Sequence, residues 1–208
     1  LGPNGDSSFI KPDISAPGVA ILSATSPEDF SSLDQDYVRL NGTSMASPVV
    51  AGAAALLKQH EPNFSAKQMK NILSNSSTPV VQNHIEERNA TPFETGAGRL
   101  NVVNALNATA YAESPNMAKQ YCLLNCRLTN QLVSVTDETN VWQAQVEFDN
   151  SAITAQVFPN QITLSSTQPS ASFEVQVSVP RTFQTDWYFG RLIWTNSRGQ
   201  TINQALAI

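Results

Sequence analysis

The sequence predicts a chain of two parts, an α/β first half followed by an all-β antiparallel sandwich. Up to about residue 110, short apolar runs mix with helical patterns, and this mixture is typical of α/β folds. After about Tyr121, apolar and polar residues alternate with a period of two, as they do in half-buried strands. A length of 208 residues fits one large domain or two small ones, and the change of period favours two.

The first half is expected to begin with a strand and a helix of small residues. Residues 19–22 (VAIL) form a short apolar run that predicts a buried strand, and a polar loop follows over 26–36. Residues 44–58 predict a helix with Pro48 in its first turn, where the missing N–H carries no cost. Because alanine and glycine make this helix small-sided, above all at 51–55, we expect it to pack centrally.

Two shorter helices and a glycine-rich passage complete the first half. The S-x-x-Q pattern that begins at Ser65 is a capping box, which predicts a helix over 66–74. Gly96-Ala97-Gly98 predicts a tight backbone passage. Asn101 is expected to cap a last short helix that ends near Asn107.

The strands of the second half are predicted from alternation and from turn residues. Residues 142–148 and 173–179 each alternate apolar side chains with Gln, Glu or Ser. Residues 196–199 (NSRG) predict a hairpin turn between strands at 190–195 and 201–208. Several short strands separated by turns predict a β-sandwich.

We therefore divide the chain into residues 1–112, a linker over 113–126, and a sandwich over 127–208. The linker is placed around the Ser-Pro-Asn sequence at 114–116, where the period changes.

Charge and hydropathy exclude several classes of function. The net charge is −5, with −3 in residues 1–110 and −2 in 111–208, so neither half offers a basic surface for nucleic acid or for an anionic membrane. The longest apolar run, 49–57, is too short to cross a hydrocarbon layer of ~30 Å. The opening LGPNGDSS shows no signal peptide, and its turn-rich character suggests the interior of a longer protein. We expect no nucleic-acid partner and no transmembrane segment.

The two cysteines indicate neither a metal site nor a redox centre. Cys122 and Cys126 are four residues apart, which is not the C-x-x-C spacing of a redox pair, and two further metal ligands are not near in sequence. They are either ordinary thiols or a local disulfide, which would stabilise the fold by ~2 kcal/mol. No metal and no cofactor is expected.

Residues 42–48 (GTSMASP) are the stretch that carries chemistry. They place Ser44 in the first turn of a helix, after a glycine that lets a substrate backbone come close. The N–H groups and dipole at a helix start favour negative charge, which the oxyanion of a tetrahedral intermediate carries. On residue pattern alone, an ordinary serine N-cap is the commoner use of such a position.

The longer string at 42–52 (GTSMASPVVAG) closely resembles the nucleophile motif of the subtilisin-like serine proteases, the subtilases. Residues 11–18 (KPDISAPG) resemble the segment that precedes that motif in the family. Residues 96–101 (GAGRLN), with Ala105, resemble the family's closing segment, and the three motifs stand in the family's order. Residues 188–194 (YFGRLIW) resemble, more loosely, the fibronectin-III-like sandwiches that follow many subtilase domains.

The resemblance implies a secreted or cell-surface serine endopeptidase that acts on proteins or peptides. Ser44 is then the nucleophile that forms the acyl-enzyme, and its own N–H donates one oxyanion-hole bond. By the same resemblance, Thr43 lies beside the oxyanion and Gly42 lines the leaving-group side. Val49 stands where many members carry a histidine that is not the catalytic one, so this departure leaves the mechanism untouched.

The resemblance also implies residues that this chain lacks. The family's catalytic Asp and His and its oxyanion-hole Asn lie well upstream of the serine, and no histidine precedes Ser44 here. His60 would lie ~24 Å along the helix and on another face, so we exclude it as the base. His84 is in a loop and is not excluded by geometry, whereas Asp13 lies in a segment that the family uses structurally. We expect the chain alone to be inert and to require the N-terminal part of the catalytic domain as its partner.

Two other functions remain compatible with the sequence. The chain can be a non-catalytic β-sandwich binding module in which Ser44 is incidental, or an inactive subtilase homologue that has lost its acid and base. The residues upstream of Leu1 in the parent sequence discriminate these alternatives.

Five N-x-S/T sequons fall in the first half. Because the chain is rich in Asn, Ser and Thr, we expect these matches to be due to chance, and a glycan on the first of them would block Ser44. They lie at Asn41, Asn63, Asn75, Asn89 and Asn107.

Overall fold

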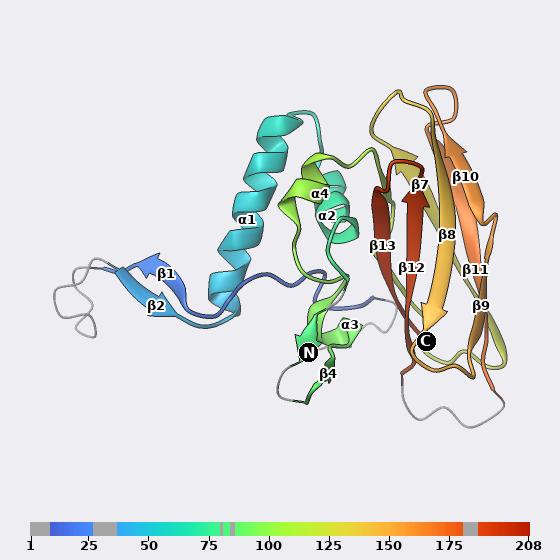
Figure 1. The fold of residues 1–208 in the computed structure, drawn as a ribbon, viewed down its shortest axis with the longest axis horizontal. Coiled ribbons are helices and arrows are strands. Elements are labelled where there is room, and N and C mark those ends of the chain that lie inside the picture. The colour runs from blue at the N-terminus through green and yellow to red at the C-terminus, as the bar shows by residue number, and fades with distance from the viewer. Residues whose placement is uncertain (1–8, 27–36, 80, 84–85, 181–186) are drawn as a thin grey trace.

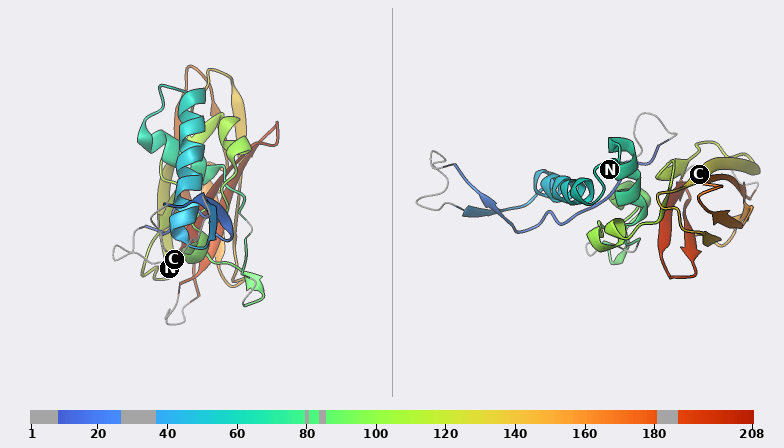
Figure 2. Two further views of the ribbon diagram at one scale, coloured as in Figure 1. Left: turned by 90° about the vertical axis from the view of Figure 1, so that its left-hand side faces the viewer. Right: turned by 90° about the horizontal axis from the view of Figure 1, so that it is seen from above.

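A computed structural model of the chain describes residues 9–26, 37–79, 81–83, 86–180 and 187–208. Figures 1 and 2 show three regions in a row, with a β-sandwich at one end, a group of helices in the middle and a two-stranded hairpin at the other end. The helices α2 (Ala66–Asn75) and α4 (Val102–Leu106) lie between the sandwich and α1 (Thr43–His60).

Two sheets form the sandwich. One has the strand order β10-β8-β12-β13-β6 and the other β5-β7-β11-β9, with antiparallel pairing throughout except between β13 and β6, which are parallel. The alternating pattern did not predict this parallel pair. The strands are β5 (Ala110–Ala112), β6 (Asn116–Ala118), β7 (Asn125–Ser134), β8 (Asn140–Phe148), β9 (Thr154–Phe158), β10 (Gln161–Leu164), β11 (Ser170–Ser178), β12 (Phe189–Asn196) and β13 (Thr201–Ala207).

The core of the sandwich lies between these sheets and follows the predicted alternation. Trp142 and Trp194 are 1% and 0% exposed, and Phe173 meets Trp194 edge to face with ring centroids 5.0 Å apart. The predicted hairpin is confirmed, because β12 pairs with β13 across the turn at 196–200. The fibronectin-like all-β half of the fold prediction is therefore confirmed.

Residues 113–126, predicted as a linker, are not an open connector. The segment contains β6, which pairs with β13, and the preceding strand β5 pairs with β7. The side chain of Asn116 accepts a hydrogen bond from the N–H of Ile10 at 3.1 Å and donates one to its carbonyl at 3.3 Å. Short strands with so few residues give no periodicity of their own, so the sequence did not reveal them.

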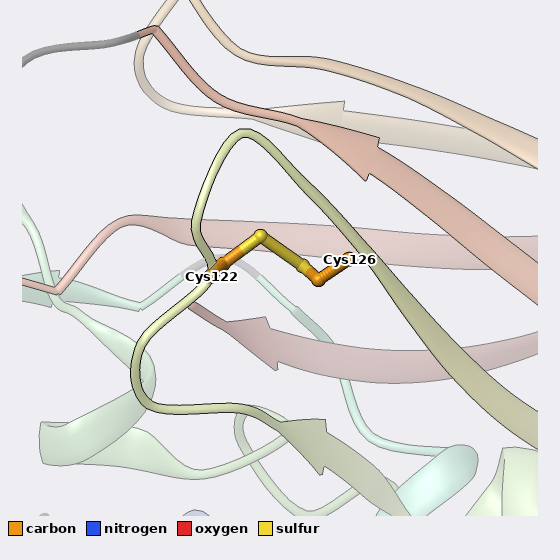
Figure 3. The surroundings of a disulfide bond; sticks show 2 residues. All are labelled: Cys122 and Cys126. Carbon is orange, nitrogen blue, oxygen red and sulfur yellow. A yellow bond between two sulfur atoms is a disulfide. The ribbon is translucent and has the colours of Figure 1, made fainter.

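A disulfide closes the end of this segment. Cys122 and Cys126 are bonded with their Cα atoms 5.4 Å apart, at the loop that leads into β7 (Figure 3). Both are buried in the sandwich core. Of the two alternatives that the spacing left open, the structure has the local disulfide.

Three helices of the first half begin and end close to their predicted bounds, namely α1 (Thr43–His60), α2 (Ala66–Asn75) and α4 (Val102–Leu106). A fourth helix, α3 (Pro92–Thr95), was not predicted. The capping box at Ser65 is present, and the Asn101 side chain accepts the N–H of Asn104 as the predicted cap. None of the helices that the structure describes has both the length and the apolar character needed to cross a membrane.

The predicted buried strand at 19–22 is wrong. Among the described residues, strand β1 (Ile21–Ala24) pairs with β2 (Tyr37–Leu40) alone, and Val19 and Leu22 are 78% and 60% exposed. An isolated two-stranded hairpin has no second layer to cover its apolar side chains. The predicted polar loop over 26–36 lies outside the described residues except for Ser26.

A parallel sheet is also missing from the part of the first half that the structure describes. The strands there form two antiparallel pairs, β1 with β2 and β3 (Gln82–Asn83) with β4 (Arg88–Asn89). The described part of the first half thus consists of helices and two short antiparallel hairpins, and the α/β half of the fold prediction is not confirmed by it.

Candidate active site

Ser44 is the second residue of α1 and its side chain is exposed. The N-cap of the helix is Gly42, so Ser44 does not serve as the ordinary serine cap that its position allowed. The first helical bonds are made by the N–H groups of Met45 and Ala46, which both donate to the carbonyl of Gly42. The N–H of Ser44 therefore lies ahead of the bonded ladder, where a helix start can bind negative charge.

The predicted position of Pro48 in the first turn is wrong. Since α1 begins at Thr43, Pro48 lies inside the helix, where it has no N–H to donate to the carbonyl of Ser44 four residues earlier. The carbonyl of Ser44, the nucleophile candidate, therefore lacks the helical hydrogen bond that residue 48 would otherwise donate to it.

The segments at 11–18 and 42–52 meet directly beside Ser44. The N–H of Gly42 donates to the carbonyl of Gly18 at 2.7 Å. A Cβ on Gly18 would lie 2.8 Å from the carbonyl oxygen of Gly42, so this approach requires a glycine. The side chain of Asn41 also accepts the N–H of Ala20 at 2.6 Å.

The glycine-rich passage at 96–98 is hydrogen-bonded to the segment at 11–18, which itself contacts Gly42. The N–H of Ser15 donates to the carbonyl of Gly98 at 2.8 Å, and the N–H of Ala97 donates to the carbonyl of Asp13 at 3.0 Å. Gly96 has φ 63°, and a Cβ there would lie 2.4 Å from the Asp13 backbone, which confirms the predicted tight passage. The three motifs that are separate in sequence are therefore held together in space.

Asp13 is held by two lysines at this junction. Its carboxylate is 2.5 Å from Lys11 Nζ and 3.0 Å from Lys70 Nζ. Burial raises the pKa of Asp13, but the hydrogen bonds and charges of the two lysines outweigh that effect and lower the pKa. The carboxylate stays ionised and paired, as suits a structural role, which is the role that the sequence analysis gave it.

The two histidines do not complete a site in the described structure. His60 is the last residue of α1, at the opposite end of the helix from Ser44, and is exposed. His84 lies outside the described residues. Among the residues that the structure does describe, no group of three or more His, Cys, Asp or Glu side chains could hold a metal ion.

The central position predicted for α1 is wrong for the chain as described. Of its described side chains only Ala53 and Leu57 are buried, and Leu56 is 50% exposed. Figure 1 shows α2 and α4 on one side of α1 only. The prediction failed because small residues indicate how closely a neighbour can approach, not whether the chain supplies one.

Sequence reasoning missed the contacts that tie the sandwich to the glycine-rich passage. Asn203 Nδ2 and Arg191 Nη1 both donate to the carbonyl of Ala97, at 2.7 and 3.1 Å. Burial lowers the pKa of Arg191, and the charges of Asp149 and Glu147 oppose that effect. The available signal was a pair of adjacent polar residues, Asn203 and Gln204, which interrupts the alternation of β13 before its apolar end at 205–207.

A second asparagine extends this contact to α2. Asn75 Nδ2 donates to the carbonyl of Asn203 at 3.0 Å, and Asn75 Oδ1 accepts the N–H of Ala112 at 2.9 Å. The buried amide thus joins the end of α2 to both sheets of the sandwich, through β13 and β5.

Comparisons with known families confirm the resemblance in both halves. Residues 2–98 match the family described as "Subtilase family", and residues 115–208 match the "Fibronectin type-III domain". The first match includes the segments at 11–18 and 42–52 and the glycine-rich passage at 96–98. It does not include residues 99–101 of the closing motif, or Arg191 and Asn203, which donate to Ala97 from the sandwich.

Curated relatives extend over almost the whole chain. Subtilisin-like protease SBT3.5 from Arabidopsis thaliana is 30% identical over 248 residues, covering 94% of this chain and 31% of the relative. Subtilisin-like protease SBT3.2 from the same plant is 28% identical over 250 residues, covering 94% and 33%. Subtilisin-like protease SBT3.10 is 27% identical over 245 residues, covering 94% and 32%. The chain spans about a third of the length of these relatives.

Solved structures match less than half of the chain, at low similarity. A FixG-related protein from Vibrio parahaemolyticus has a TM-score of 0.39 and 11% identity, covering 49% of this chain and 95% of that protein. Likenesses at this level have no bearing on function.

Proposed function

We propose that this chain, a subtilase segment joined to a fibronectin-type-III domain, is the carboxyl-terminal part of a subtilisin-like serine endopeptidase, called here the intact protease. Its relatives are named subtilisin-like proteases, and it spans about a third of their length. The substrates are proteins or peptides, whose bonds are hydrolysed through a serine nucleophile.

Ser44 carries the reaction in this proposal. Its Oγ attacks the carbonyl carbon of the scissile bond while a histidine of the upstream part accepts the hydroxyl proton, and the amine then leaves with that proton. Water hydrolyses the resulting acyl-enzyme. The N–H of Ser44 donates to the oxyanion, Thr43 lies beside that oxygen, and Gly42 lines the leaving-group side.

One observation supports this assignment above the others. Ser44 is exposed at a helix start where it does no capping, and the Gly42 to Gly18 hydrogen bond of 2.7 Å joins its motif to the segment at 11–18. An incidental serine would not require two distant segments to meet at its side with a glycine at the point of contact.

The upstream part of the catalytic domain is the proposed partner of the exposed apolar surface. Leu56 on α1 is 50% exposed, and Val19 and Leu22 near β1 are 78% and 60% exposed. In the intact protease, strands of a parallel α/β sheet cover these residues, and the same part supplies the catalytic Asp and His and the oxyanion-hole Asn. The chain alone is therefore inert, because a serine hydroxyl is a poor nucleophile without a base.

The intact protease is secreted or held at the cell surface. The disulfide between Cys122 and Cys126 supports this location, since such bonds form and persist in oxidising compartments.

The test is hydrolysis of a denatured protein by the intact protease and its Ser44→Ala variant. We expect the variant to lose at least ~1,000-fold in rate, because removal of a triad serine leaves only the oxyanion hole and binding. The control is Ser151→Ala, an exposed serine in the sandwich and outside all three motifs, which should keep its activity. Circular dichroism should show the same fold in all three proteins.

The alternatives give different results in the same assay. An inactive homologue or a binding module gives no hydrolysis with Ser44 in place. Hydrolysis that survives Ser44→Ala would contradict the assignment of the nucleophile.

A further inference from the structure

The structure separates the sequons of the first half by exposure. Asn63, Asn89 and Asn107 are exposed, whereas Asn75 is 1% exposed. We propose that Asn63, Asn89 and Asn107 are attachment sites for N-linked glycans and that Asn75 is not. The assignments of these four asparagines do not depend on whether Ser44 is a nucleophile, and only the omission of Asn41 rests on the proposed function.

The three exposed sites lie at ends of elements, where a glycan can extend into solvent. Asn63 is in the turn between α1 and α2, and Asn107 is the C-cap of α4. Asn89 is the last residue of β4 in the short β3–β4 hairpin. None of these positions faces the sandwich core or the network of motifs around Ser44.

The hydrogen bonds of these asparagines are compatible with a glycosylated amide. Asn89 uses its Oδ1, which accepts from Gln82 Nε2 at 2.7 Å, so its nitrogen can carry the sugar. Asn107 Nδ2 donates to the carbonyl of Val103 at 2.9 Å, and a glycosylated amide keeps one N–H for this bond.

Asn75 cannot accept a glycan in the folded chain. Its Nδ2 donates to the carbonyl of Asn203 at 3.0 Å, and its Oδ1 accepts the N–H of Ala112 at 2.9 Å. The side chain of Asn75 is 1% exposed, so there is no room for a sugar beside it. A sugar on this nitrogen would therefore force α2 away from β13. The buried sequon is therefore an internal negative control.

The distribution of the sequons argues against the chance origin expected from composition. Five of the ten asparagines in residues 1–107 lie in a sequon, whereas none of the eight in residues 108–208 does. The disulfide Cys122–Cys126 supports folding in an oxidising compartment, because such bonds form and persist there. The secretory pathway is such a compartment, and N-linked glycans are attached in it.

Attachment is a group transfer from a lipid-diphosphate-linked oligosaccharide. The asparagine Nδ2 forms a bond to the anomeric carbon of the first sugar, and the bond from that carbon to the diphosphate oxygen breaks. The lipid diphosphate leaves with the bonding electrons, and the nitrogen loses one proton.

Asn41 is left out of the proposal. It lies three residues before Ser44, where a glycan would compete for the space in front of the proposed nucleophile.

The experiment is secretion of the 208-residue chain from a eukaryotic cell line, followed by peptide mass spectrometry after glycan release by an amidase in heavy-oxygen water. We expect the isotope mark of a released glycan at residues 63, 89 and 107, and an unmodified Asn75. The variants Asn63→Gln, Asn89→Gln and Asn107→Gln should each lose one glycan, whereas the control Asn160→Gln, at an exposed asparagine outside any sequon, should lose none.

Either of two results would overturn the proposal. One is a secreted chain in which any of the three assigned peptides is predominantly unmodified, and the other is a glycan on Asn75. The peptide measurement on the unaltered chain decides the matter even if a variant fails to fold.

Discussion

The β-sandwich and the helix that carries Ser44 differ in how completely their apolar side chains are covered. Trp194 of the sandwich is fully buried, whereas Leu56 of α1 is 50% exposed. Both regions are rich in apolar residues. The two sheets of the sandwich cover each other, whereas among the described residues the helices α2 and α4 lie on one side of α1. The sandwich thus covers its own core, whereas much of the apolar surface of α1 is left uncovered by the residues that the structure describes.

The largest expected effect tests the sandwich side of this comparison. Trp194→Ala should lower the free energy of unfolding by about 3–5 kcal/mol, the usual cost of removing a fully buried aromatic side chain. Because its indole N–H is buried without a hydrogen-bond partner among the described residues, the loss is one of packing alone. Urea unfolding followed by circular dichroism measures it.

The matched variant on α1 is Leu56→Ala, which should cost less than about 1 kcal/mol in the 208-residue chain. In the intact protease the same change should cost about 2–5 kcal/mol, because the side chain is then covered. Equal costs in the two proteins would contradict the proposed covering of α1 by the upstream part.

A smaller effect is expected at the contact between the two regions. Asn203→Ala removes one of the two donors to the Ala97 carbonyl and should cost about 1–2 kcal/mol, since Arg191 still donates to it. The control is Asn160→Ala at an exposed turn, which should stay within ~0.5 kcal/mol of the unaltered chain. An unchanged urea midpoint for Asn203→Ala would mean that this contact does not hold the two regions together.

The smallest effect is a pH dependence beside the glycine-rich passage. The hydrogen bonds from Arg88 lower the pKa of Glu94 to about 2, against the effect of burial and with help from Thr91 and Asn83. The folded-state pKa is below the unfolded value of about 4.3, so this stabilisation is present above that pH and is lost as the pH falls towards 2.

Glu94→Gln should therefore cost about 1 kcal/mol at pH 7 and less at pH 3, where the unaltered chain has itself lost part of the stabilisation. The measurement is the free energy of unfolding of both proteins at the two pH values. The exposed Glu61→Gln is the control. A cost for Glu94→Gln that is the same at pH 3 as at pH 7 would exclude the paired carboxylate as its source.

Local rules predicted the elements whose signals are contained within a few residues. The capping box at Ser65, the cap at Asn101 and the alternation from Trp142 to Phe148 all specify backbone hydrogen bonds or sheet faces over a short range. The family motifs likewise selected Ser44 as the nucleophile candidate, because the string itself is specific, and this assignment stays a prediction.

Features that depend on distant partners could not be predicted in this way. The apolar run at 19–22 reads the same whether or not a second layer covers it, and the strands β5 and β6 are too short to show a period. The carbonyl of Ala97 accepts from residues 94 and 106 positions further along the chain, and no spacing rule connects them. Whether an apolar strand is covered by a second layer, and which distant side chains donate to one carbonyl, depends on the whole fold and not on local sequence.

The most direct test of the proposal that this chain holds only part of the active site is labelling by a fluorophosphonate probe, which reacts with serines that a neighbouring base has activated. We expect the intact protease to be labelled at Ser44 and the 208-residue chain to remain unlabelled, because the proposed base and oxyanion-hole Asn belong to the upstream part. Stoichiometric labelling of the 208-residue chain at Ser44 would contradict the account, since a base such as His84 would then have to be in place within this chain.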